Sequence, residues 1–197
     1  MLDEEGRIAR ELAGTRVKFD EHYAPLIYTS AGQVSVVTPY GVGGRIGVRI
    51  HVEYLDQWSN EIELPVADTE PGIFTLNGSG KGQAAILHAD YSVNTPENPI
   101  DRGGTVLLYV TGEGETDPGG VDGKLASAVL PKPREAVSVT IGGVPATVDY
   151  AGAAPGMTAG VMQVNVRIPM GVQPGAAEVV VTVGRQSSPA GVFVSVK

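Results

Sequence analysis

The most acidic stretch of the chain is Glu113–Gly123, which carries two glutamates and two aspartates among glycines and one proline. Calcium takes about six to eight oxygen ligands, and carboxylates at the end of a β-scaffold can supply several of them. The spacing does not fit an EF-hand, which needs a glycine at its centre and a bidentate glutamate at its end. A long turn between strands uses the same glycine and proline residues. The sequence therefore predicts no metal site and leaves calcium binding by Glu113–Asp122 open.

Other residue types used in catalysis are scattered along the chain. The histidines His22, His51 and His88 fall on different expected strands and loops, without the spacing of zinc ligands. No Gly-x-Ser-x-Gly elbow occurs, and Gly78–Gly82 lacks both the full phosphate-loop pattern and a following helix. Cysteine is absent, so disulfides and thiol chemistry are excluded. We predict no catalytic residue, no cofactor-binding residue and no metal ligand, and a protein that is not an enzyme.

Three aromatic residues are candidates for contacts rather than for chemistry. Trp58, the only tryptophan, lies in a turn-like stretch where an exposed ring could meet a glycan or another partner. We favour the alternative that Trp58 packs over an open edge of the first domain. Tyr28 and Tyr150 occupy equivalent positions, and we expect their rings in the core and their hydroxyls on backbone carbonyls.

The elements that would position these residues occur twice. Val17–Phe19, Ala24–Tyr28 and Gln33–Val36 are followed by a proline and an alternating strand, and the same order recurs at residues 139–141, 146–150 and 163–166. The step from tyrosine to glutamine is eight residues longer in the second copy, which places an insertion in one loop. A repeat in fixed order indicates duplicated structural units.

Alternating apolar and polar residues mark most of the expected strands. Val48–Tyr54 and Val179–Val183 alternate as half-buried antiparallel strands do, and Val106–Val110 is apolar throughout, as a central strand can be. Only Glu4–Leu12 suggests a helix, because Ile8 and Leu12 are four residues apart and Gly14 follows. The fold class is therefore all-β, a tandem of immunoglobulin-like β-sandwiches.

The two copies differ ahead of the repeat. The second copy has expected strands near residues 83–87 and 104–110, whereas the first has only residues 1–13, too few for two strands and a connection. We divide the chain into an N-terminal segment, 1–13; an incomplete sandwich, 14–70; a glycine-rich linker, 71–82; and a complete sandwich, 83–197. An open sandwich exposes backbone groups and an apolar face, which domain two or a strand of another chain would cover. Removal of N-terminal residues from a longer protein would leave the same gap.

Composition narrows the class of partner. The net charge of −8 argues against nucleic acid, and no apolar run approaches the length of a membrane span. The acidic start, with Asp3, Glu4 and Glu5, is unlike a signal peptide, so a leader would have been removed or would lie upstream.

Several stretches resemble an uncharacterised C-terminal module of secreted and surface proteins from soil bacteria, especially acidobacteria. They are AGTRVKFD, APLIYTSAGQVSVVTPY, SNEIELPV, PGIFTLNGSGKGQAAIL, YVTGEGETDPGGVDGKLA and VTIGGVPATVDYAGAAPG, the last followed by QVNVRIPMGV. The likeness runs from Leu12 onward, and it implies an immunoglobulin-like fold of the IPT/TIG type without catalytic residues. Family members usually carry a strand pair before the first repeat, which this chain lacks.

We therefore predict a non-enzymatic structural or interaction module, a spacer or adhesion-type unit of a secreted or cell-surface bacterial protein. Its expected partners are other domains of that protein or another copy of itself, and a glycan is an option. One alternative is a self-assembling subunit completed by strand exchange with a neighbour. Another is a carbohydrate-binding module that uses Trp58 or the region of Tyr91.

Overall fold

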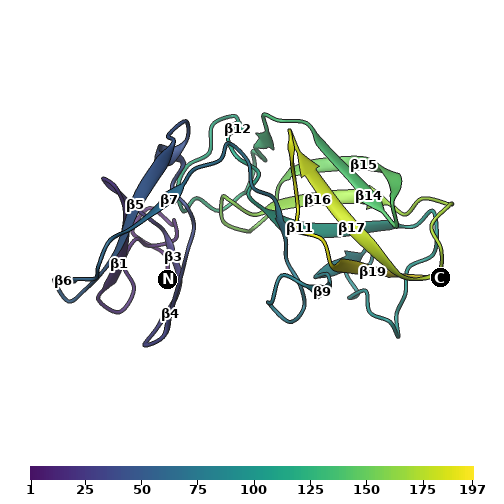
Figure 1. The fold of residues 1–197 in the computed structure, drawn as a ribbon, viewed down its shortest axis with the longest axis horizontal. Coiled ribbons are helices and arrows are strands. Elements are labelled where there is room, and N and C mark those ends of the chain that lie inside the picture. Colours follow the sequence, from purple (N-terminus) through teal and green to yellow (C-terminus); the bar gives the residue numbers. More distant parts are fainter.

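The strands of the chain form two lobes that follow one another in sequence (Figure 1). The computed structural model describes all residues, 1–197. The first lobe comprises β1–β7 and a short 3-10 helix, η1. Their bounds are β1 Thr15–Phe19, β2 His22–Tyr23, β3 Leu26–Ser30, β4 Gln33–Val36, η1 Tyr40–Val42, β5 Gly47–Tyr54, β6 Gln57–Trp58 and β7 Ile62–Pro65. A five-stranded sheet has the order β2-β1-β5-β6 with β7 also on β5, and β3 and β4 form a separate hairpin.

The second lobe comprises β8–β19. Its strands are β8 Gly72–Ile73, β9 Gly82–Gln83, β10 Ile86–His88, β11 Thr105–Thr111, β12 Thr116–Asp117, β13 Lys132–Pro133, β14 Val137–Ile141, β15 Val144–Ala153, β16 Met162–Arg167, β17 Gly175–Val183, β18 Gln186–Ser187 and β19 Val192–Val196. Ten of them form a sheet of order β10-β11-β16-β15-β14-β17-β19-β9, with β18 on β17 and β8 on β11. The hairpin of β12 and β13 stands apart from that sheet.

The two lobes repeat one pattern of strand pairing. β1 pairs with β5 as β14 pairs with β17, and β3 pairs with β4 as β15 pairs with β16. β5 is flanked by β6 and β7 in the same way as β17 is flanked by β18 and β19. The register also agrees, because Tyr28 and Tyr150 each follow a bulge at the same place in their hairpins. The duplication that the sequence predicts is therefore confirmed strand by strand.

A side-chain contact is repeated as well. The Val52 N–H donates to the Ser59 hydroxyl at 2.9 Å, and the Val181 N–H donates to the Ser188 hydroxyl at 3.1 Å. Each serine N–H donates back to the carbonyl of the same valine at 2.8 Å. In both lobes, the same pair of serine–valine hydrogen bonds thus closes the turn after the long strand.

The lobes differ in what covers their cores. In the second lobe β11 lies beside β16, and its inward side chains join a core cluster of 20 buried residues. The first lobe has no strand in the place of β8, β10 or β11, and its cluster has only five buried residues. The chain is all-β, two immunoglobulin-like sandwiches in tandem, the first without its opening strands.

Two sequence predictions about local structure are wrong. Residues 4–12 form no helix: Leu2 and Ile8 pair across a turn, in which the Asp3 carboxylate accepts from the N–H groups of Glu5 and Arg7. Gly6 lies in this turn with φ of 73°, a conformation that interrupts a helix.

The predicted linker 71–82 is not a free link between lobes. β8 pairs with β11, and Gly82 pairs with Val192 of β19, so both ends of the segment belong to the second lobe. Between them the Asn77 side chain accepts from the N–H and the hydroxyl of Ser79, which holds the glycine-rich stretch as a turn.

Candidate functional sites

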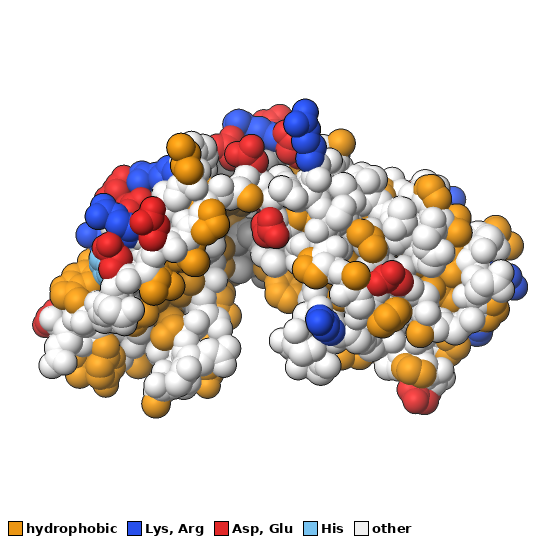
Figure 2. Space-filling model, viewed as in Figure 1, with side chains coloured by type: hydrophobic (Ala, Val, Ile, Leu, Met, Phe, Trp, Pro, Cys, Tyr) orange, Lys and Arg blue, Asp and Glu red, His pale blue; other side chains and the backbone are white.

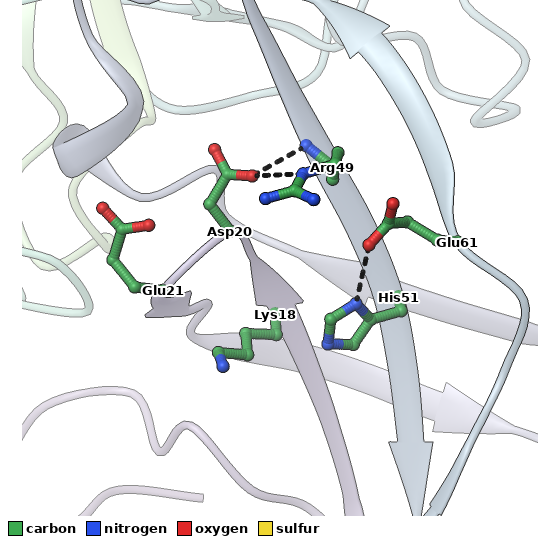
Figure 3. Close-up of a pocket in the computed structure, with 6 residues that line it drawn as sticks. All are labelled: Lys18, Asp20, Glu21, Arg49, His51 and Glu61. Carbon is green, nitrogen blue, oxygen red and sulfur yellow. Dashed lines mark hydrogen bonds and ion pairs between the residues drawn. The ribbon is translucent and has the colours of Figure 1, made fainter.

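The outer face of the first lobe carries a cluster of charged side chains around a shallow recess of about 310 Å³ (Figure 3). Its lining residues are Lys18, Asp20, Glu21, Arg49, His51 and Glu61, none of them hydrophobic. They lie together because β1 and β5 are paired, so that the polar members of two alternating strands share one face.

Asp20 organises one side of this polar recess. Its carboxylate accepts from the Arg49 N–H at 3.2 Å and from the Arg45 guanidinium at 2.8 Å. The bond from the Arg49 N–H, with the two guanidinium contacts, holds the pKa of Asp20 below its ordinary value. Arg45 also pairs with Glu21 at 2.5 Å. These charges neutralise one another, and the recess offers hydrogen-bonding groups rather than a strong net field.

Trp58 lies at the edge of the same face. It is directly across from Glu53 in the β5–β6 pair, and its ring meets that of His51 edge-on at 4.4 Å between centroids. Half of Trp58 is exposed, at 52%. The expectation that Trp58 packs over the open edge is therefore wrong, because Trp58 of β6 lies on the same polar face of the sheet as His51 and Glu53 of β5.

The acidic loop predicted as an inter-strand turn forms the joint between the lobes. The Tyr40 N–H of η1 donates to Asp122 at 2.9 Å, and the Ile8 N–H donates to the Gly123 carbonyl at 2.8 Å. Gly120 lies against the Tyr40 ring so closely that a Cβ there would overlap it. Burial raises the pKa of Tyr40 to about 12, with a contribution from the charge of Glu113. We call this set of contacts the joint.

The carboxylates of this loop do not converge. Glu115 pairs with Arg134 at 2.5 Å, and Asp122 faces Tyr40 and Arg10. No group of three or more acidic or histidine side chains is placed to hold a metal ion. Glu113 alone is buried, at 3% exposure, and its Oε2 atom has no hydrogen-bond partner. Burial raises the pKa of Glu113 to about 7, although the Gly160 N–H opposes the shift.

The three histidines lie apart, as their spacing suggests. His22 is near Arg45, His51 is in the polar recess and faces Glu61 at 3.9 Å, and His88 bonds to Asn94 and Ser92.

Tyr28 and Tyr150, at equivalent positions of the two copies, differ in burial and in hydrogen bonding. The Tyr150 hydroxyl donates to the Ala153 carbonyl at 2.8 Å, as predicted, but Tyr28 is 50% exposed. The inserted residues of the second copy extend β15 to Ala153 and so supply that carbonyl. The shorter β3 ends at Ser30 and offers no equivalent, so the prediction for Tyr28 is wrong.

The inner face of the first lobe is apolar and only partly covered. Val34 and Val36 of β4 and Ile50 of β5 are half-buried, while Ile62 and Leu64 of β7 are 49% and 46% exposed. Hydrophobic side chains are visible over the lower part of this lobe, beside the notch between the lobes, and charged ones gather along the upper edge (Figure 2). We use the name open face for the set Val34, Val36, Ile50, Ile62 and Leu64. The open face lies where the sequence predicts that strands are missing.

Comparison with known proteins identifies no family for this chain. No protein-family model and no curated protein matches the chain. Among solved structures, SGBP-B of the mixed-linkage glucan utilization locus of Bacteroides ovatus, in complex with a mixed-linkage heptasaccharide, is 15% identical, covering 93% of this chain and 36% of that one, with a TM-score of 0.31. Domains 4–9 of the surface layer protein SbsC are 16% identical, covering 100% of this chain and 24% of that one, with a TM-score of 0.21. At such TM-scores neither likeness supports a statement about function.

No helix of the chain is long and apolar enough to cross a membrane.

Proposed function

We propose that the protein is a non-enzymatic spacer, a module that holds other domains of a secreted or cell-surface bacterial protein at a fixed distance and angle. The observation that carries this proposal is the joint. Two sandwiches connected by a free linker would move independently, whereas here the loop after β11 seats the Tyr40 ring against Gly120 and bonds its N–H to Asp122.

Contacts of the segment that connects the lobes support the same role. The Thr69 hydroxyl, in the segment between the lobes, donates to the Val183 carbonyl at 2.9 Å in a buried position. Glycines at 112 and 114 allow the backbone of residues 68–70 to lie directly on the loop, where a Cβ would clash with the carbonyls of Asp68 and Glu70. The connecting segment is thus fixed along its length.

The spacer role is tested by the distance between the lobes. Spin labels on Gln57→Cys and Gln173→Cys are specific because the chain has no other cysteine, and both positions are exposed. Electron–electron double resonance should give one narrow distance distribution. Gly120→Val, which forces the Tyr40 ring away, should broaden it, and Gly119→Val, where a Cβ meets open space, is the matched control. A broad distance distribution in the doubly labelled protein that keeps Gly119 and Gly120 would refute the spacer role.

A second candidate function is glycan binding at the polar recess. The observation that favours it is the half-exposed Trp58 beside His51 and Glu61, since an aromatic ring next to hydrogen-bonding groups is the usual combination at such recognition surfaces. Saturable binding to members of a glycan panel should be lost in Trp58→Ala and kept in Tyr91→Ala, which removes an exposed ring elsewhere. A panel without any saturable ligand would remove this candidate.

A further inference from the structure

The edge of β4 has no neighbour in the first lobe. β3 and β4 form a hairpin of two strands, and the equivalent β16 lies between β15 and β11. The β4 edge faces the notch between the lobes and is not paired with the second lobe (Figure 1). Its outward backbone N–H and C=O groups are therefore available to an added strand.

The open face beside this edge corresponds to a closed core in the second lobe. By register, Val34, Val36 and Leu64 match Val164, Val166 and Val194, which are all fully buried. The side chains that close the second core come from β11, whose Val106, Leu108 and Val110 point inward and are fully buried. β11 thus shows, within the same molecule, the kind of strand that covers such a face.

The β4 edge also lacks the usual protection against pairing. Exposed edges of sheets normally carry charges, proline or bulges that discourage another strand. β7, at the other open edge, carries Glu63, directly follows Glu61 and ends in Pro65. Residues 30–38, which include β4, carry no charged side chain. The difference indicates that β4 is the edge built to be paired.

A second copy of the chain is a poor source for the missing strand. Each chain carries one β11 and two acceptor strands, β16 and β4, so exchange of β11 between copies leaves as many open edges as before. The N-terminal segment is already engaged, because Ile8 bonds to Gly123 and the Ala9 carbonyl accepts from Leu26. Neither β11 of a second copy nor the N-terminal segment therefore supplies the missing strand.

We propose that β4 accepts an antiparallel strand of another protein chain, with uncharged apolar residues at alternate positions. In the register of β11 on β16, an apolar residue lies opposite Val36 and a second one, two positions further on, opposite Val34. The inward side chains of the added strand cover the open face, and its backbone completes the hairpin into a three-stranded sheet. This binding role adds to the spacer role and does not depend on it.

The test uses a strand whose fit the second lobe already demonstrates. A fluorescent peptide with the sequence of Gly104–Gly112, carrying Leu107→Lys and Tyr109→Lys at the two positions that do not face the core, is titrated with the whole protein. The control peptide has serine in place of Val106, Leu108 and Val110, so that only its inward side chains differ. Because these changes are in the peptide, folding of the protein is not at risk.

Saturable binding that is at least about tenfold weaker for the control peptide is expected, since three apolar side chains lose their burial. Amide exchange should slow at β4 and stay unchanged at β16, which β11 already covers. No binding, equal binding of both peptides, or slowing at β7 instead of β4 would overturn the proposal. A dimer of the protein alone, with β4 already protected, would make a second copy the occupant and would overturn it as well. None of these results depends on the distance between the lobes.

Discussion

Replacing Glu113 by glutamine should make the stability of the protein less dependent on pH. The Glu113 carboxyl is buried at the joint near Tyr40 and Tyr150, and its Oε2 atom has no partner. Glutamine has nearly the same shape and stays neutral at every pH. The substitution therefore removes an ionisable group while leaving the packing of the joint in place.

The magnitude follows from the raised pKa. In the folded protein burial raises the pKa of Glu113 to about 7, compared with an ordinary value of 4.5. At about 1.4 kcal/mol for each unit, this difference corresponds to about 3 kcal/mol. Since the folded pKa is raised, the stabilising effect of the proton is complete below pH 4.5 and is lost as the pH rises through about 7. Ionised Glu113 thus destabilises the folded state at pH 8.

The measurement is urea unfolding, followed by circular dichroism, at pH 5 and pH 8. Glu113→Gln should be more stable than the unmodified protein at pH 8, by up to about 3 kcal/mol, and should differ from it much less at pH 5. All other titrating groups are shared, so they cancel in the difference. Glu115→Gln is the matched control: it removes a charge from the same loop, but at an exposed ion pair worth at most about 1 kcal/mol. An equal effect of Glu113→Gln at both pH values would refute the reasoning.

Two further substitutions test the packing of the lobes. Asn94→Ala should lower the free energy of unfolding by about 1–3 kcal/mol, because the fully buried Asn94 amide oxygen accepts from the Ser195 N–H, which is left unpaired, while the Ser195 carbonyl keeps the Ile100 N–H; a chemical denaturation midpoint close to that of the unmodified protein would contradict this. Ser188→Ala should lower the free energy of unfolding by about 1–3 kcal/mol, because it leaves the Val181 N–H unpaired in a buried position. The equivalent Ser59→Ala should lower it by less than about 1 kcal/mol, because the Val52 N–H is left unpaired in an exposed position. Thermal unfolding of the two variants side by side would show the difference, and equal losses would speak against it.

The sequence predicts the strands well where one face is buried. Val179, Val181 and Val183 occupy every second position of β17 and are all fully buried, because the pleat sends alternate side chains to opposite faces. The missing strands of the first lobe could be predicted by the same comparison of copies.

Local signals fail where a side chain competes with the backbone pattern. Ile8 and Leu12 have helical spacing, but the Asp3 carboxylate binds the amides of a turn that ends at Arg7. The position of Trp58 depends on the register of the β5–β6 hairpin, which residue types alone do not predict; pairing with Glu53 places it on the polar side. The burial of Glu113 depends on residues of both lobes, and no pattern within its own loop indicates it.

The central claim is that the first lobe is a copy of the second that lacks the partner of β4. Backbone amide exchange of the isolated protein tests this most directly. Val164 and Val166 of β16 lie between two strands, whereas Val34 and Val36 of β4 have a strand on one side only. The account predicts strong protection of the β16 amides and much faster exchange along β4. Equal protection of the two strands would contradict it.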